Sequence, residues 1–355
     1  MLENKTEQPA IECRNVWKIF GDRSVEALHA VKTKGLTKDQ VHEEYGCVVA
    51  VANASFQALE GEIFCIMGLS GSGKSTLVRH INRLIEPTAG DILIENEDIN
   101  ALDAKQLRKI RAEKIGMVFQ HTALLPHRTV RENVALGLEL RHVDESHRLN
   151  IAQKKLELVQ LDGWEDRMPS ELSGGMQQRV GLARAMAADP SILLMDEPFS
   201  ALDPLIRRQL QDQFLELARK MNKTTIFITH DLDEAIRIGN RIAIMKDGEI
   251  VQIGTPEQII TAPANDYVAE FVKDISRLKL VSAQSIMRPI DDYLKDNSLD
   301  QNLCPRAPHD ADLDELINLA IDHENPILVL KQDKEVGVIT KRQLLRGIQG
   351  RDANE

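Results

Sequence analysis

Long apolar runs and an excess of basic charge are both missing from this chain of 355 residues. The longest apolar stretches, such as SILLM at 191–195, have the length of a strand, whereas a bilayer span needs about 20 apolar residues. Forty-four Lys and Arg against 55 Asp and Glu give a net charge of −11. We therefore expect neither a transmembrane protein nor a general nucleic-acid binder, because phosphate contacts need concentrated Lys and Arg.

Cysteine pairing and a secretory leader are absent as well. Cys13, Cys47, Cys65 and Cys304 are scattered, without the spacing of a metal site or a disulfide framework. The first residues, MLENKTEQPA, are polar and acidic and contain no signal-peptide core. We expect plain core or surface cysteines in a reducing, cytosolic compartment.

Short β-branched runs alternate with helical patterns from about residue 10 to 255, which predicts an α/β fold. The expected elements are a buried strand over 62–68, a helix over 74–85, strands over 191–197 and 224–230, and a hairpin over 241–254 that turns at Asp247-Gly248. Residues 102–186 are mainly helical and predict a helical subdomain. Residues 27–50 predict a charged helical insertion that has no chemistry of its own.

The character of the sequence changes after about residue 280. The segment 279–307 is polar and irregular and predicts a linker, and 308–350 follows the pattern helix, strand, strand, helix. We therefore predict a large domain over 1–278 and a small α+β module over 308–350.

A glycine-rich loop follows the strand predicted at 62–68. Gly68, four further residues, Gly73, Lys74 and Ser75 match the phosphate-loop pattern between a strand and a helix. Backbone N–H groups of such a loop surround the β-phosphate of a nucleotide, the lysine reaches the β- and γ-phosphates, and the serine ligates Mg²⁺. The predicted phosphate-binding residues are Gly68, Ser70, Gly71, Gly73, Lys74, Ser75 and Thr76.

Polar residues at three other strand ends complete a predicted hydrolytic site. Asp196 ends an apolar strand and is expected in the Mg²⁺ shell, and the adjacent Glu197 is expected to be the base for an attacking water. His230 also ends a strand, where it can contact the γ-phosphate. Gln120 is either a further Mg²⁺ or water ligand or a surface glutamine.

A second glycine loop, LSGGMQQ at 172–178, lacks the lysine and the magnesium serine of the first. It can still cap a γ-phosphate through the Ser173 hydroxyl, the Gly174 and Gly175 amides and a helix N-terminus. The simplest geometry is a head-to-tail homodimer in which each loop closes over the nucleotide of the other copy. A ligand-free helix N-cap is the alternative.

The motifs GLSGSGKST, LSGGMQQ, ILLMDEP, SALD and ITHD occur in the order and spacing of ATP-binding cassette (ABC) proteins, and the resemblance covers residues 11 to about 275. It implies ATP and Mg²⁺ as cofactors, Gln120 as the lever to a membrane subunit and Asp203 as a contact across the dimer. Gln177 belongs to the signature loop. The aromatic side chain that stacks on adenine is best assigned to Phe20, with Trp17 a weaker candidate.

Finer features, including NRLIEPTAGDI, DEPFSALDPLIRRQLQ and the 27–50 insertion, resemble the ATPase subunit of bacterial glycine betaine/proline/choline importers. The resemblance implies a homodimer that docks residues 120–133 under a separate membrane permease, on the cytoplasmic face of the membrane, with a periplasmic or tethered binding protein. Importers of polyamines, amino acids or sugars are the alternative. Soluble DNA-repair or translation cassettes and non-hydrolysing nucleotide sensors fit less well.

The C-terminal module resembles a CBS module. Relatives usually end in two tandem CBS modules, whereas only PILVLKQDKEVGVITKRQLLRGI, at 326–348, looks like one here. Two interpretations stay open: two copies pair across the dimer and sense a ligand or ionic strength, or the single module only braces the dimer.

Overall fold

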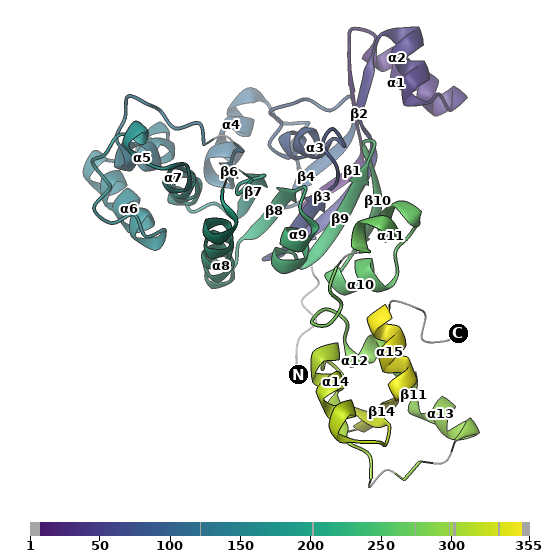
Figure 1. Cartoon of the computed structure of the whole chain (residues 1–355). Coiled ribbons are helices and arrows are strands. Elements are labelled where there is room, and N and C mark those ends of the chain that lie inside the picture. The colour runs from purple at the N-terminus through teal and green to yellow at the C-terminus, as the bar shows by residue number, and fades with distance from the viewer. Residues whose placement is uncertain are drawn as a thin grey trace. The chain divides into compact units, whose positions relative to one another are not determined.

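The structure is a computed structural model that describes residues 8–349 except 121, 201, 274, 298, 301, 302 and 333 (Figure 1). The chain divides between Ile253 and Gly254 into two compact units. The α/β fold class predicted from the sequence is confirmed by the first unit, which carries two sheets with helices around them.

The first unit contains one antiparallel and one mainly parallel sheet. The antiparallel sheet has the order β2-β1-β4-β5, formed by β1 (Pro9–Phe20), β2 (Val48–Leu59), β4 (Ala89–Ile94) and β5 (Glu97–Asp98). The second sheet has the order β10-β9-β3-β8-β7-β6, formed by β3 (Ile63–Met67), β6 (Ile115–Val118), β7 (Ile192–Asp196), β8 (Thr224–Thr229), β9 (Arg241–Lys246) and β10 (Glu249–Gly254). Strands β9, β3, β8, β7 and β6 run parallel.

One apolar core joins the two sheets. Every residue of β3, β7 and β8 is buried. Burial on both faces explains why β3 and the first four residues of β7 are continuously apolar rather than alternating, whereas β8 places threonines at both of its ends. The rings of Phe56 in β2 and Phe64 in β3 stack with centroids 5.0 Å apart. Burial of such side chains contributes about 25 cal/mol per Å² of apolar surface, so this core fixes the strand order that the site depends on.

Helices surround the parallel sheet. They are α3 (Lys74–Ile81), α4 (Ala104–Glu113), α5 (Val130–Leu140), α6 (Glu145–Leu158), α7 (Gly174–Ala187), α8 (Pro204–Met221) and α9 (Leu232–Ile238), with a 3₁₀ turn over Pro169–Glu171. Figure 1 shows α5, α6 and α7 as a group beside the β6 edge of the sheet. Thr129 starts α5 with a capping box to Glu132. The predicted helical region 102–186 thus holds α4 to α7 and one strand, β6.

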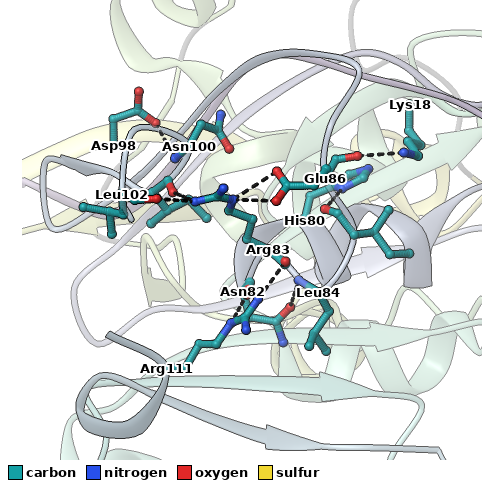
Figure 2. A network of polar contacts seen from close by, with 12 residues as sticks. Lys18, His80, Asn82, Arg83, Leu84, Glu86, Asp98, Asn100, Leu102 and Arg111 are labelled. Atoms are coloured by element: carbon teal, nitrogen blue, oxygen red, sulfur yellow. Dashed lines mark hydrogen bonds and ion pairs between the residues drawn. The ribbon is translucent and has the colours of Figure 1, made fainter. Parts of the chain in front are cut away.

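The helix that follows the phosphate loop ends at Ile81, four residues before the predicted end. Arg83 adopts a positive φ of 52° that breaks the helix. Arg111 of α4 donates hydrogen bonds of 2.7 Å to both the Asn82 and the Arg83 carbonyl oxygens, and the Arg83 guanidinium bonds Glu86 and the Ile99 carbonyl (Figure 2). The hydrogen bonds from Arg111 satisfy carbonyl groups at the end of α3 that no longer have partners within the helix. The spacing of apolar residues in the sequence cannot reveal such a distant partner.

The predicted insertion between β1 and β2 consists of two helices, α1 (Ser24–Lys34) and α2 (Lys38–Tyr45). Phe20 and Val48 pair across β1 and β2, so the chain leaves and re-enters the sheet at one point. The insertion has its own small core, formed by Ile19, Ala27, Leu28, Val41, Cys47, Val49 and Ala52.

The second unit contains another four-stranded sheet, with the order β11-β14-β13-β12. Its elements are α10 (Pro256–Thr261), α11 (Asp266–Val272), α12 (Ala283–Ile286), β11 (Arg288–Pro289), α13 (Ile290–Asp296), β12 (Arg306–Pro308), α14 (Leu313–Asp322), β13 (Ile327–Lys331), β14 (Lys334–Ile339) and α15 (Lys341–Gln349). The pattern helix, strand, strand, helix predicted over 308–350 is present as α14, β13, β14 and α15.

The structure differs from the predicted irregular linker over 279–307 and from a domain boundary at 278. Val281, Ala283 and Ile286 are buried in one core with Leu313 and Leu316, and the segment contributes α12, β11, α13 and β12. The segment is therefore part of the second unit. Its apolar residues are few, but short elements need only a few to join a core.

Candidate nucleotide site

The strand order brings four polar loops to one edge of the parallel sheet. The phosphate loop follows β3, His230 follows β8, Glu197 follows β7 and Gln120 lies two residues after β6. Because β3, β8, β7 and β6 are neighbours in this order, their carboxyl ends meet where ligands of open α/β sheets bind. One cavity is lined by Ala50, Leu69, Ser70, Gly71, Gly73, Lys74, Ser75, Thr76, Gln120, Glu197 and His230.

Lys74 is a buried cation at the floor of this cavity. Its side-chain nitrogen donates hydrogen bonds of 2.8 Å to the Gly68 carbonyl and 3.0 Å to the Leu69 carbonyl. Burial lowers the pKa of Lys74, and the carboxylates of Glu197 and Asp196 oppose that shift. The loop therefore holds a desolvated positive charge through neutral carbonyls, an arrangement that favours an incoming anion.

Gly73 provides the N-terminus of the following helix without a side-chain cap. Its φ is 97°, and a Cβ at this position would collide with the Ala50 carbonyl oxygen, so only glycine fits. Because no side chain caps α3, the first N–H groups of the helix lack that partner. Together with the helix dipole they form a site that suits a phosphate.

Ser75 and Asp196 bring two oxygen ligands together. The Ser75 hydroxyl donates a 2.7 Å hydrogen bond to Asp196 Oδ1, and Asp196 is only 1% exposed. Arg79, one turn after Ser75, lies 3.4 Å from Asp196 Oδ2. A hydroxyl and a carboxylate are the hard oxygen donors that Mg²⁺ prefers, so the donor set fits this ion.

Glu197 is surrounded by polar side chains from two neighbouring strand ends. His230 Nδ1 lies 3.1 Å from Glu197 Oε2, and Gln120 Nε2 lies 3.5 Å from the same oxygen. A carboxylate can only accept, so the imidazole donates its Nδ1 proton and leaves Nε2 as an acceptor in the neutral ring. Glu197 has a left-handed φ of 47°, a strained conformation that is common where a side chain must face a ligand.

The second glycine loop lines a different cavity. Ser173 caps α7 by accepting a hydrogen bond from the Met176 N–H at 3.3 Å. The surrounding cavity is lined by Gln160, Leu161, Trp164, Ser173, Gly174, Gly175, Met176, Arg179, Leu202, Asp203 and Ile206. None of these residues lines the phosphate-loop cavity. Asp203 therefore lines the same cavity as Ser173, and its side chain caps α8 by accepting a hydrogen bond from the Ile206 N–H.

Two expected ligand residues lie outside these cavities. The Gln177 amide donates to the Pro169 and Leu172 carbonyls at 3.0 and 3.3 Å and so braces the loop from behind. Phe20 is 42% exposed at the end of β1, with the Lys18 ammonium 4.9 Å from its ring centroid. It is not among the lining residues of the phosphate-loop cavity. Its role on adenine stays a prediction.

Some residues at the site were missed by sequence reasoning. Arg79 follows Ser75 by four residues on a helix, a spacing that could have placed both beside Asp196. Ala50 could not be recognised from the sequence, because its backbone carbonyl group, and not its side chain, lies next to Gly73. Arg184 of α7 donates to the Thr122 and Ala123 carbonyls at 2.6 and 2.9 Å, which links the signature helix to the segment after Gln120.

In the described ranges, none of the helices has both the length and the apolar character to cross a bilayer. All four cysteines are buried and free.

Comparisons with known proteins agree with this geometry. A family model described as ABC transporter matches residues 51–200. The chain is 55% identical over 278 residues to the glycine betaine transport ATP-binding protein OpuAA of Bacillus subtilis, which covers 78% of this chain and 66% of that protein. It is 52% identical to the glycine betaine/proline betaine transport system ATP-binding protein ProV of Salmonella typhimurium, over 78% and 69% of the two chains.

A third relative matches over almost its full length. The trimethylamine N-oxide transport system ATP-binding protein TmoW of Pelagibacter ubique is 45% identical over 322 residues, which is 90% of this chain and 94% of that protein. Among solved structures, the dimeric post-hydrolysis state of the ATP-binding cassette MJ0796 bound to ADP and phosphate superposes with a TM-score of 0.59. It is 34% identical and covers 69% of this chain and 98% of that one.

Proposed function

Since this chain belongs to the family of ABC transporter ATP-binding proteins, we propose that it hydrolyses ATP to power import of a small, fully N-methylated osmolyte, with glycine betaine the first candidate. The enzymatic part of the proposal is supported by one cavity that is lined by Lys74, Ser75 and the Glu197–His230 pair. Asp196 is hydrogen-bonded to Ser75 at this cavity. The proposed substrate is supported by sequence identities of 52–55% between this chain and relatives that are named for glycine betaine transport.

Trimethylamine N-oxide is the second candidate substrate. The match covers 66% of OpuAA and 69% of ProV, which are named for betaine transport, whereas it covers 94% of TmoW. Both osmolytes present a nitrogen that carries only carbon or oxygen substituents, so neither can donate an N–H hydrogen bond. The choice between them is made by other subunits, because a positively charged methylated nitrogen is recognised by aromatic faces and this chain has only 4% aromatic residues.

The chain's own residues account for binding and hydrolysis of ATP. Lys74 and the uncapped start of α3 attract the β- and γ-phosphates. Ser75 and Asp196 would hold Mg²⁺, which supplies charge neutralisation at the phosphates when bound. Glu197 accepts a proton from the attacking water, and His230 holds the carboxylate in place through its Nδ1 proton. The Gln120 amide lies 3.5 Å from Glu197 Oε2, so a nucleotide that binds at Glu197 would change the contacts of Gln120.

A complete site needs a second copy of the chain. Ser173 and Asp203 line a cavity that shares no residue with the phosphate-loop cavity. In a symmetric dimer each copy can present Ser173 and the Gly174 and Gly175 amides to the nucleotide of the other. The relative MJ0796 forms a dimeric structure with ADP and phosphate. We propose a homodimer docked under membrane permease subunits at the cytoplasmic face, fed by a substrate-binding protein.

Transport assays test this function. The chain, reconstituted in liposomes with the permease and binding protein that co-purify with it, should import labelled glycine betaine or trimethylamine N-oxide only with ATP on its own side. Glu197→Gln should keep ATP binding and form a stable dimer while import and hydrolysis stop. Stimulation of ATPase activity by a polyamine or an amino acid, with no response to either osmolyte, would contradict the substrate class.

A further inference from the structure

The insertion between β1 and β2 places one lysine beside the phosphate loop. Thr37 caps α2 through a capping box with Gln40, and Lys38 is the first residue of the helix. Its ammonium group approaches the β9–β10 hairpin: a Cβ built on Gly248 would lie 3.1 Å from Lys38 Nζ and 2.8 Å from the Ala50 carbonyl oxygen. The insertion thus reaches the core next to Ala50, a residue of the nucleotide cavity.

The hairpin turn is fixed between the phosphate loop and β2. Gly248 N–H donates to the Ser72 carbonyl at 3.0 Å, and the Gly248 carbonyl accepts from Ala52 N–H at 2.8 Å. Asp247 and Gly248 both have positive φ, as the two-residue turn predicted there requires. Gly248 Cα would lie 3.5 Å from a Cβ on Gly73. The turn, Ala50 and Gly73 therefore form one wall, and Lys38 lies against it.

The ammonium group of Lys38 is left without a direct partner in the described part of the chain. It forms neither a hydrogen bond nor an ion pair there, although it is partly buried. Burial lowers the pKa of Lys38, and the charges of Asp247 and Glu249 oppose this shift without reversing it. A desolvated ammonium without a hydrogen-bond acceptor is costly, and an anion that binds next to it removes the cost.

The position of Lys38 identifies which part of a nucleotide lies closest. Val48 pairs with Phe20, the expected adenine platform, and Ala50 lies two residues further along β2, about 7 Å away at strand spacing. Gly73, beside Ala50, starts the helix that receives the phosphates. A nucleotide that extends from Phe20 to the phosphate loop passes the Ala50 wall with its ribose and α-phosphate.

We propose that Lys38 is a nucleotide-binding residue whose ammonium group binds the α-phosphate of ATP, so that the insertion is a working part of the nucleotide site. The inference rests on the proposed function, because it takes the phosphate-loop cavity as the ATP site. It deepens that function by giving the α-phosphate a side-chain ligand, while Lys74 serves the β- and γ-phosphates.

Equilibrium binding of ADP and ATP to the purified full chain in the presence of EDTA tests this role. Lys38→Met should weaken both nucleotides by the same factor, about tenfold for one lost charge-assisted hydrogen bond, because both carry the α-phosphate. Lys38→Arg should recover most of the affinity. Lys34→Met, which removes an exposed lysine at the end of α1, is the matched control and should bind as the wild type does.

Asp247→Asn separates nucleotide binding from a purely structural role. If Lys38 only anchors the insertion to the acidic hairpin, Asp247→Asn and Lys38→Met should weaken nucleotides and lower Tm together, and that result would overturn the inference. Unchanged ADP affinity of Lys38→Met, measured against a wild type that binds normally, would overturn it too. A wild-type chain that binds no nucleotide would instead refute the proposed function.

Discussion

The Ser75 hydroxyl donates a 2.7 Å hydrogen bond to Asp196 Oδ1, which joins the first turn of α3 to the end of β7. Packing in the core and the pairing of β7 with β8 hold these two elements independently of this hydrogen bond, and Asp196 Oδ2 also lies 3.4 Å from the Arg79 guanidinium. The pair is therefore free to exchange its mutual hydrogen bond for a shared cation.

Ser75→Ala should abolish the effect of Mg²⁺ on nucleotide binding. Without Mg²⁺ the variant should bind ATP within about twofold of the wild type, because the backbone N–H groups and Lys74 remain. With Mg²⁺ the wild type should gain affinity and the variant should not. Titrations in EDTA and in Mg²⁺ measure this difference, with Ser55→Ala, on the outer face of β2, as the control. A variant that still responds fully to Mg²⁺ would exclude Ser75 as a ligand.

Mixed dimers should show whether the two glycine loops act between copies. Ser173→Arg and Lys74→Ala chains should each be inactive alone, because every site then lacks one half. In a mixture of equal amounts, half of the dimers pair the two variants and each has one intact site, so about a quarter of the wild-type activity should return. ATPase assays of the reassembled mixtures measure this recovery. A mixture that stays inactive would show that both loops act within one chain.

Asn133 should be among the most sensitive residues of the helical group. It is fully buried, its Oδ1 accepts from Leu125 N–H at 2.7 Å, and its amide donates to the Leu125, Arg128 and Thr129 carbonyls. Asn133→Asp removes the donors and buries a charge against carbonyl oxygens, which should lower the free energy of unfolding by about 3 kcal/mol or more. Denaturant unfolding measures the loss, and Asn133→Ala should cost less.

Stability should depend on pH through Glu234. Burial raises the pKa of this carboxyl group above its ordinary value, although Gln211 Nε2 donates to it at 2.8 Å. The folded state therefore disfavours ionisation, and stability falls as pH rises from the unfolded pKa to the folded one. Glu234→Gln should raise Tm at pH 8 and leave it unchanged near pH 4. A gain of equal size at both pH values would show that ionisation is not its source.

The features that sequence reasoning recovers are those whose chemistry is local. The phosphate loop, the carboxylates at Asp196 and Glu197 and the turn at Asp247 each require particular residue types in consecutive positions, so their patterns are visible without a fold. The strand order then brings these motifs to one edge of the sheet. This is the expected result when several parallel strands are each followed by polar residues.

The features that it misses depend on distant partners. The end of α3 is decided by Arg111, which lies 28 residues beyond Arg83 and caps its carbonyl. The Gln177 side chain donates hydrogen bonds to the Pro169 and Leu172 carbonyls, which are partners that its own motif does not predict. Lys38 looks like one charge among many in an acidic chain, and its closeness to Gly248 arises only from tertiary packing.

The pairing of Phe20 with Val48 means that the excursion through α1 and α2 begins and ends about one inter-strand spacing apart, near 4.8 Å. A detour that returns to its starting point can be lengthened without displacing either strand, so the insertion is a natural place to graft a reporter. It is not a place to shorten the protein, because removal of α1 and α2 would uncover Ile19, Val49 and Ala52, which share the core of the insertion.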